Sequence, residues 1–582
     1  MTSSRGGGEG RARGVPEAIS SALFAIGMTV VALFSGILLV LALGSTAFYA
    51  EPNYEDFVIS SVIGGEWGPA AASLVACLVL LAAAVALARR VVRWSEPAAV
   101  FAALALTTAL GLWWVLIQGA QSSAFPDSQH VLTYAMEAAR GDWSSFTDSA
   151  GVTALELMPD DAHRYFTQYP FQSGVFLVFM LVCRLFPADP VAALLVINVI
   201  ANEVSFACLY ALGRWLVRSA GGRAAMLLLM VLCVPLWLSA ALPYGNSLGL
   251  AFGCIFLLLQ GRALVLPREA RVARVALVVA SIVPLCAVMV VKSTFILLGI
   301  AALIAWVVRG LRQRTALLPA LVLVAVAVAN AAGGVPARLV EDRAGLDLGD
   351  GMPKASWIVM GLNESDVTGL PGWWDLEAWE IMMDAEGDID AQGAEALARI
   401  TERLGELAAD PAEALAFFSA KLSTEWCEPT FESVYYSSLN VRSDGTFFDP
   451  YAALGLEFPA REALVPWDGY QSLAYLGALL GFARLLKRHD DEGVGTLLAA
   501  VFLAGFGCYL LWEAKSVYTL PFFFMLLPVA AYGLEGLASI AAPRTAGGAH
   551  FAAGPRVRPS LRKKGRSEVA MCGSPDYSDG VA

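Results

Sequence analysis

The sequence has little charge and few groups suited to metal binding. Only 15% of its 582 residues are charged, and it contains four histidines. Its nine cysteines form no CxxC motif and no Cys/His pair with metal-ligand spacing. These absences argue against a metal site built from Cys and His and against a disulfide framework. The net charge of −12 argues against nucleic acid as a partner.

Apolar residues dominate the chain instead, at 57% of the sequence. A soluble domain is about 45–50% apolar, and runs of about 20 apolar residues are long enough to cross a membrane. The sequence therefore predicts an all-α polytopic membrane protein. We expect twelve transmembrane helices, at about 20–46, 69–88, 97–118, 190–213, 223–241, 247–265, 275–292, 294–309, 316–333, 470–486, 494–512 and 518–541.

A thirteenth apolar run, 169–186, decides the topology. Arginines occur in five groups of three, at positions 5, 11 and 13, at 89, 90 and 93, at 214, 218 and 223, at 268, 271 and 274, and at 309, 312 and 314. Positively charged loops are expected on the cytoplasmic side. If 169–186 crosses the membrane, the last three clusters fall outside. If it lies along the outer face as a juxtamembrane helix, every cluster is cytoplasmic and both termini are inside.

This topology divides the chain into five parts. Residues 1–19 form a cytoplasmic N-terminus, with a first helix that is retained because no small-residue cleavage signal follows it. We expect a transmembrane core at 20–333 that includes an external loop at 120–189, and a small extracytoplasmic region at 334–468. Two further ranges complete the chain, the C-terminal transmembrane helices at 469–541 and a cytoplasmic basic tail at 542–582. Sixteen acidic residues stand against three basic ones between Asn363 and Glu428.

The external loop carries the first candidate site residues. Asp127 follows Pro126 directly after a predicted span, where it suits either a helix N-cap or a base held at the membrane surface. His130 would share a helical face with Asp127 and could orient it, contact phosphate or bind a metal. We expect the loop's other acids, such as Glu137 and Asp142, to be solvated.

Further candidates lie where other spans reach the same side. Tyr169 and Gln172 open the juxtamembrane helix, and Tyr244 and Asn246 form a tight turn between two spans. Either pair has an ordinary structural role as well, as a belt residue, helix start or turn. Lys292 closes a span on the outer side, where a lysine either binds phosphate or extends to lipid headgroups. Lys515 and Tyr518 lie between the last two spans, near Glu513.

The ordered set of these residues resembles the bacterial GT-C glycosyltransferases, which include protein O-mannosyltransferases and aminoarabinose transferases. The resemblance rests on Pro126–His130, Ala138–Asp142 and Tyr169–Gln172, followed by Lys292 and the segment from Glu513 to Pro521. Two positions depart from the pattern, since the turn at Tyr244 lacks an acid and Val517 stands where arginine is usual.

The resemblance implies an enzyme of the bacterial cell membrane with its active site on the extracytoplasmic face. It would move a sugar from a polyprenyl-phosphate carrier to a surface glycan, lipid or protein by inverting displacement, with Asp127 as the base. It leaves open whether a divalent cation serves as cofactor. Two alternatives remain: a polysaccharide polymerase or ligase with a diphosphate-linked donor, and a non-enzymatic flippase or transporter. The first would be expected to carry external arginine clusters, and the second ionisable residues such as Glu203 within the spans.

Overall fold

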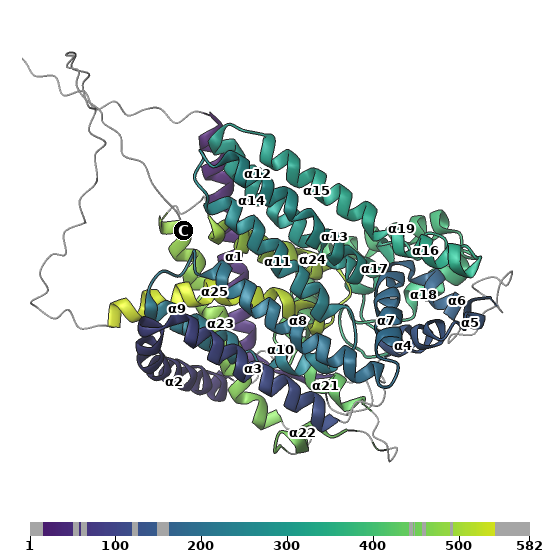
Figure 1. The fold of residues 1–582 in the computed structure, drawn as a ribbon, viewed down its shortest axis with the longest axis horizontal. Helices are drawn as coiled ribbons and strands as arrows, with labels where there is room; N and C mark the ends of the chain where they lie inside the picture. The colour runs from purple at the N-terminus through teal and green to yellow at the C-terminus, as the bar shows by residue number, and fades with distance from the viewer. Residues whose placement is uncertain are drawn as a thin grey trace, which may run out of the picture. The chain divides into compact units, whose positions relative to one another are not determined.

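The computed structural model describes residues 15–49, 57–59, 67–118, 126–147, 162–440, 446, 448–456, 461–488 and 493–541 (Figure 1). The N-terminal arginines, the basic tail, and the loop acids Asp148, Asp160 and Asp161 lie outside these ranges. The described residues as far as Ser539 belong to one compact unit. They are helical, apart from a short antiparallel hairpin of β1 (Ala47–Tyr49) and β2 (Phe57–Ile59).

The long helices account for most of the described chain. They are α1 (Val15–Gly44), α2 (Trp67–Trp94), α3 (Glu96–Gln118), α8 (Pro190–Gly213), α11 (Asn246–Val265), α14 (Ile296–Gln313), α15 (Leu317–Gly333), α19 (Ile389–Ala409), α20 (Pro411–Trp426), α23 (Arg461–Arg488), α24 (Val494–Leu511) and α25 (Ser516–Ala541). The shorter α-helices are α4 (Pro126–Ala139), α5 (Ser144–Thr147), α6 (Ala162–Gln168), α7 (Ser173–Leu185), α9 (Ala220–Val231), α10 (Val234–Leu238), α12 (Arg271–Ala280), α13 (Ile282–Val291), α16 (Val335–Ala344), α17 (Ala355–Leu362), α18 (Glu377–Asp384), α21 (Ser433–Ser438) and α22 (Pro450–Ala453). Three 3₁₀ turns join them: η1 (Pro170–Gln172), η2 (Ser239–Ala241) and η3 (Ser293–Phe295).

Within the described residues, ten helical segments are long and apolar enough to cross a membrane, and the bent pair α9 and α10–η2 raises the number to eleven. The length and apolar composition of these helices indicate a multi-pass membrane protein. The predicted span at 470–486 falls within α23, which is not among the ten; polar and charged residues such as Gln471 and Arg484 interrupt its apolar run. The count of twelve spans stays a prediction.

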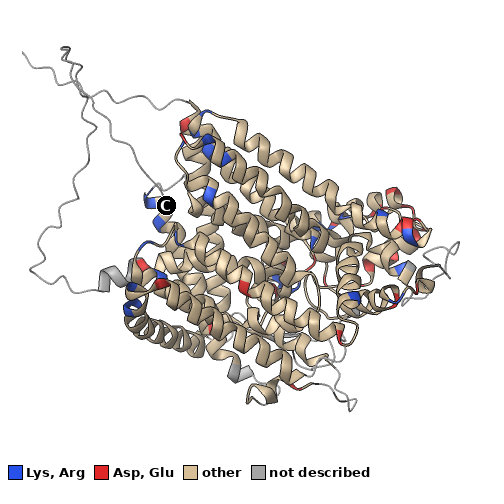
Figure 2. Ribbon diagram, in the orientation of Figure 1, with Lys and Arg blue, Asp and Glu red and all other residues tan. Residues whose placement is uncertain are grey.

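The helical bundle joins segments that are far apart in the chain. The first helix, α1, packs along α23 and also contacts α14, α24 and α20, while α8 packs along α11. The buried centre is filled by large side chains, among them Trp306, Tyr475 and Phe522. Figure 2 shows long stretches of these helices without charge, whereas acidic and basic residues gather around α18 and α19.

The short apolar helix from Pro170 to Leu185 is the run that decided the predicted topology. Its length is below that of the spanning helices. It packs against α4, α8, α13 and α16, so one face of it is buried by protein. Its placement along a membrane face stays a prediction.

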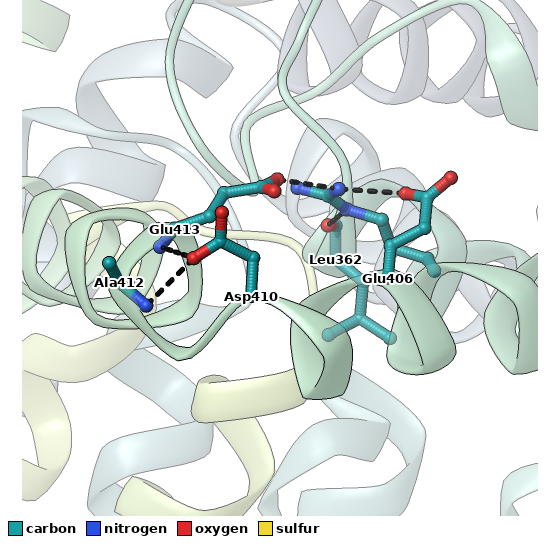
Figure 3. A network of polar contacts seen from close by, with 6 residues as sticks. Leu362, Glu406, Asp410, Ala412 and Glu413 are labelled. Carbon is teal, nitrogen blue, oxygen red and sulfur yellow. Dashed lines mark hydrogen bonds and ion pairs between the residues drawn. The ribbon is translucent and has the colours of Figure 1, made fainter.

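Residues 334–468 contain a long helical stretch that is divided into α19 and α20 at Asp410. The Asp410 carboxylate caps α20 by accepting hydrogen bonds from the backbone N–H groups of Ala412 and Glu413. The corner is braced by Arg403, whose Nη1 lies 2.9 Å from both Glu406 and Glu413 (Figure 3).

The end of this region folds into the bundle instead of staying at its surface. Every residue from 421 to 440, which we call the buried segment, is buried. Its backbone carbonyls accept hydrogen bonds from α23 and α25: Gln471 and Tyr475 donate to Trp426 O, and Thr519 donates to Glu425 O. The buried segment therefore brings charged side chains among the membrane helices.

The predicted topology has a direct test at Arg218, an exposed residue between α8 and α9. We expect a cysteine at position 218 to react with a membrane-impermeant maleimide only after the cells are opened. A cysteine in place of Asp142, which is also exposed, should react in intact cells. The parental chain gives the background, and labelling at position 218 in intact cells would reverse the assigned orientation.

Candidate functional site

Asp127 lies in the first turn of α4, directly after Pro126, so it is a helical residue and not the N-cap. Proline suits the first helical position because its missing N–H is not needed there. A carboxylate in the first turn is stabilised by the positive end of the helix dipole. The hydroxyl of Tyr244 donates to Asp127 Oδ2 at 3.4 Å. His130, one turn later, packs against Tyr165 in a tilted arrangement with 5.3 Å between ring centroids.

Tyr244 is the central residue of the site. Its phenol also accepts a hydrogen bond from the side-chain amide of Gln172, and both residues are buried. Burial raises the pKa of Tyr244 well above its usual value, and the nearby Asp127 carboxylate raises it further. Burial likewise raises the pKa of Tyr165, with Asp127 again adding to the effect. Both phenols therefore stay protonated, as hydroxyl groups facing a carboxylate.

Lys292 lies over the ring of Tyr244. It occupies a break between α13 and η3, where its backbone is extended. Its Nζ lies 4.4 Å from the ring centroid of Tyr244 and 5.3 Å from that of Tyr518, within range of cation–π attraction. Burial lowers the pKa of Lys292 to about 8, and the carboxylates of Asp127 and Glu513 oppose that fall.

Two glycines allow neighbouring segments to pack closely on the backbone just before Lys292. A Cβ on Gly174 of α7 would lie 1.8 Å from Val290 O, and a Cβ on Gly245 would lie 2.0 Å from Val291 O. Any side chain at either position would displace the end of α13. The helix that follows Tyr169 and the turn that carries Tyr244 are thus both packed directly on the residues before Lys292.

Replacement of Gly245 by alanine should move Lys292 and destabilise the protein. The new methyl group overlaps a backbone oxygen that cannot rotate away, and overpacking of this kind costs about 1–3 kcal/mol. We expect a lower thermal midpoint by differential scanning fluorimetry. Gly507→Ala in α24 is the matched control, because its Cβ would meet no atom within 4 Å. Equal midpoints for the two variants would remove the close contact from the account of the site.

The segment between α24 and α25 completes the charged group. Glu513 and Lys515 are buried there, and the hydroxyl of Tyr518 donates to Glu513 Oε2 at 3.5 Å. Glu513 and Lys515 both affect the pKa of Lys292 and the pKa of Tyr169. The ammonium of Lys421 donates to Trp512 O at 2.7 Å and to Gly361 O at 2.5 Å, which fixes the start of this segment.

The buried segment supplies three further acids that the sequence did not single out. Glu428 and Glu432 both accept a hydrogen bond from the hydroxyl of Ser516, the first residue of α25. Glu432 also accepts from the Ser516 N–H at 2.7 Å, so it caps the helix that follows Lys515. Phe431 and Glu432 have φ of +49° and +59°, a strained backbone that these bonds hold in place.

Glu425 differs from these two acids. Its carboxylate oxygens are buried without a hydrogen-bond partner. Burial raises the pKa of Glu425 well above its usual value, opposed by Lys421. The sequence contained one sign that these acids are buried: Glu425, Glu428 and Glu432 are three to four residues apart and have aromatic residues between them. The many acids in the rest of the region hid this sign.

The structure brings together most of the predicted site residues. The residues in contact or electrostatic range of one another are Asp127, Tyr169, Gln172, Tyr244, Lys292, Lys515 and Tyr518. Asn246 begins α11 beside Tyr244, and its buried side-chain oxygen has no hydrogen-bond partner. His130 meets the site through Tyr165. Within the described ranges, no group of three or more His, Cys, Asp or Glu is arranged to hold a metal ion.

Two other loop acids have local hydrogen-bond partners, the exposed Asp142 and the half-buried Glu137. Asp142 accepts hydrogen bonds from the N–H and hydroxyl of Ser144, which lowers the pKa of Asp142 below its usual value. Glu137 accepts from the hydroxyl of Ser145. Neither contact leads to Tyr244, so among the described acids of this loop Asp127 is the one that faces the cluster.

No family model, curated protein or solved structure matches this chain. The resemblance to GT-C glycosyltransferases therefore stays a prediction from the residues. What can be argued about function comes from the geometry around Tyr244.

Proposed function

We propose that the protein is a membrane glycosyltransferase that moves a sugar from a polyprenyl-phosphate carrier to an acceptor outside the membrane. One observation carries the proposal: a carboxylate and an ammonium group flank the same buried tyrosine. Asp127 contacts the hydroxyl of Tyr244, and Lys292 lies over its ring. Transfer from a lipid phosphate requires these two groups close together, one for the acceptor proton and one for the leaving phosphate.

Asp127 is the proposed base. In a single displacement the acceptor hydroxyl attacks the anomeric carbon of the donor sugar, and its proton passes to the Asp127 carboxylate. The bond from the anomeric carbon to the phosphate oxygen breaks as the new glycosidic bond forms, and the configuration inverts. The phenol of Tyr244 donates to Asp127 without taking that proton, because burial keeps the pKa of Tyr244 high.

Lys292 is the proposed binding group for the leaving phosphate. A buried ammonium is strongly attracted to a polyprenyl phosphate, whose charge increases as the sugar departs. Lys515 lies close enough to affect the ionisation of Lys292 and would add a second positive charge. Gln172 and Asn246 provide amide groups for the sugar, and the buried oxygen of Asn246 is free to accept a hydrogen bond from a hydroxyl.

Purified protein in lipid vesicles, supplied with radiolabelled polyprenyl-phosphate sugars and a cell-envelope extract as acceptor, tests the proposal. We expect the label to move from the lipid fraction to the acceptor fraction. A diphosphate-linked donor in a parallel reaction separates this activity from that of a polymerase or ligase. Transfer from neither donor would reject the proposal.

A flippase or transporter is the second candidate, and Glu203 favours it. This residue lies within the α8 span, and both of its buried carboxylate oxygens lack a hydrogen-bond partner. Unpaired acids inside a membrane often mark a transport path. Movement of the labelled lipid across the vesicle membrane without transfer of its sugar would support this function, and Glu203→Gln should then abolish the movement.

A further inference from the structure

Aromatic rings form a continuous series around the site. The rings of His130, Tyr165, Tyr169, Trp357 and Trp512, which we call the aromatic arc, follow one another with centroid distances of 5.3, 5.3, 6.4 and 5.8 Å. They come from α4, α6, the turn before η1, α17 and the end of α24. Because α6 and the turn before η1 are contiguous, four separate chain segments contribute to one surface.

Both ends of the arc lie beside charged residues of the proposed active site. His130 is one helical turn from Asp127, and Trp512 directly precedes Glu513. In the middle of the arc, Tyr169 is influenced electrostatically by Asp127, Glu513 and Lys515. The arc thus borders the acid and the cations instead of packing in a separate core.

The arc is exposed along part of its length. Tyr165 is buried, but Tyr169, Trp357 and Trp512 are only partly so. Phe171 contacts Tyr169 at 6.1 Å and Trp357 at 5.9 Å, and 44% of its surface is exposed. The rings therefore lead from the surface at Phe171 to the buried groups around Asp127.

The outer rings are held rigidly. Trp357 and Trp512 stack almost in parallel, with 9° between their planes. A Cβ on Gly361 would lie 2.5 Å from Trp512 O, and Lys421 donates to both of these backbone positions. A membrane-belt tryptophan requires no such mutual stacking and no connection to a buried acid.

We propose that Phe171, Trp357 and Trp512 form the acceptor subsite and that the acceptor is a glycan of pyranose units. A pyranose presents an apolar face of C–H groups to a flat ring and hydroxyls at its edge, so it suits rigid aromatic rings bordered by polar groups. The acceptor reaches Asp127 from Phe171, while the donor phosphate occupies Lys292. This inference rests on the proposed function and defines its acceptor class.

Binding of soluble glycans by the full-length protein tests the subsite. The Asp127→Asn variant in lipid nanodiscs is titrated with gluco-, manno- and galacto-oligosaccharides, followed by tryptophan fluorescence and saturation-transfer NMR. We expect at least one series to bind. Trp357→Ala or Trp512→Ala in the same background should weaken that binding about tenfold, as loss of a stacking ring does.

Trp374→Ala is the matched control, since Trp374 is 37% exposed, lies in the same region and is outside the arc. It should change the affinity less than twofold. Phe171→Ala, at an exposed ring, provides a second test if Trp357→Ala lowers stability. Absence of binding to every oligosaccharide, or equal effects of the arc and control variants, would overturn the subsite. Because turnover is not needed here, this failure is distinct from a failure of the labelled-sugar transfer assay.

Discussion

The Asp127→Asn variant should lose sugar transfer by about 10³-fold, the range expected for removal of a general base. An asparagine oxygen can still accept the hydrogen bond from Tyr244, so the cluster keeps its shape while losing the group that takes the proton. The measurement is the initial rate of label transfer from a polyprenyl-phosphate sugar. The thermal midpoint should stay close to that of the parent protein.

Asp142→Asn is the control for this result. Asp142 belongs to the same loop but is exposed and bonded only to Ser144 among the contacts described above. Its replacement should leave transfer within twofold of the parent protein. Retained turnover in Asp127→Asn would remove Asp127 from the mechanism, whatever its position in the cluster.

Replacement of Lys292 by methionine should raise the KM for the lipid-phosphate donor by about 10²-fold or more, since charge-assisted contacts to phosphate contribute strongly in a buried site. Methionine has a similar length and keeps contact with Tyr244 and Tyr518 without the charge. Lys354→Met, at an exposed lysine before α17, is the matched control and should leave KM unchanged. An unaltered donor KM in Lys292→Met would assign the phosphate to another residue.

The pH dependence provides an independent measurement of the same residue. Since burial lowers the pKa of Lys292 to about 8, its positive charge is lost as the pH rises through that value. Donor affinity should fall above about pH 8, and Lys292→Arg should extend activity to higher pH. The contribution of Lys292 to the stability of the folded protein changes with pH in the opposite direction. Between about pH 8 and the usual pKa of 10.5 the unfolded chain binds more protons, so Lys292 makes the folded state relatively more stable as pH rises.

Hydrophobic patterning was sufficient to predict most of the long apolar helices. The run at 190–213 became α8 (Pro190–Gly213), and the run at 494–512 became α24 (Val494–Leu511). These predictions succeed because a span is recognised from local composition alone. Local composition was less informative for α23, where polar residues that hydrogen-bond to the buried segment interrupt the apolar run. Gln471 is the clearest example.

The site was harder to predict because it depends on contacts between distant segments. The sequence identified Asp127 and Lys292 as candidates. However, the residues next to them in the sequence do not predict that Tyr244 contacts both. That contact follows from the close packing of Gly245 against Val291, which a hydropathy pattern does not encode. Glu425, Glu428 and Glu432 were missed for the converse reason. Acids in a polar region are expected in water, and only the fold shows that their segment is buried.

The buried segment also determines when the protein can finish folding during its synthesis. Glu428 and Glu432 depend on Ser516, and Glu425 O accepts from Thr519, both in the last helix of the described chain. These partners are translated 84 to 94 positions after the residues that they bind. Until α25 enters the membrane, the carboxylates of Glu428 and Glu432 lack these partners and cannot leave water without a large desolvation cost. The cluster around Tyr244 is therefore assembled only after the ribosome has completed α25. A chain truncated before Ser516 would lack Tyr518 and the partners of Glu428 and Glu432.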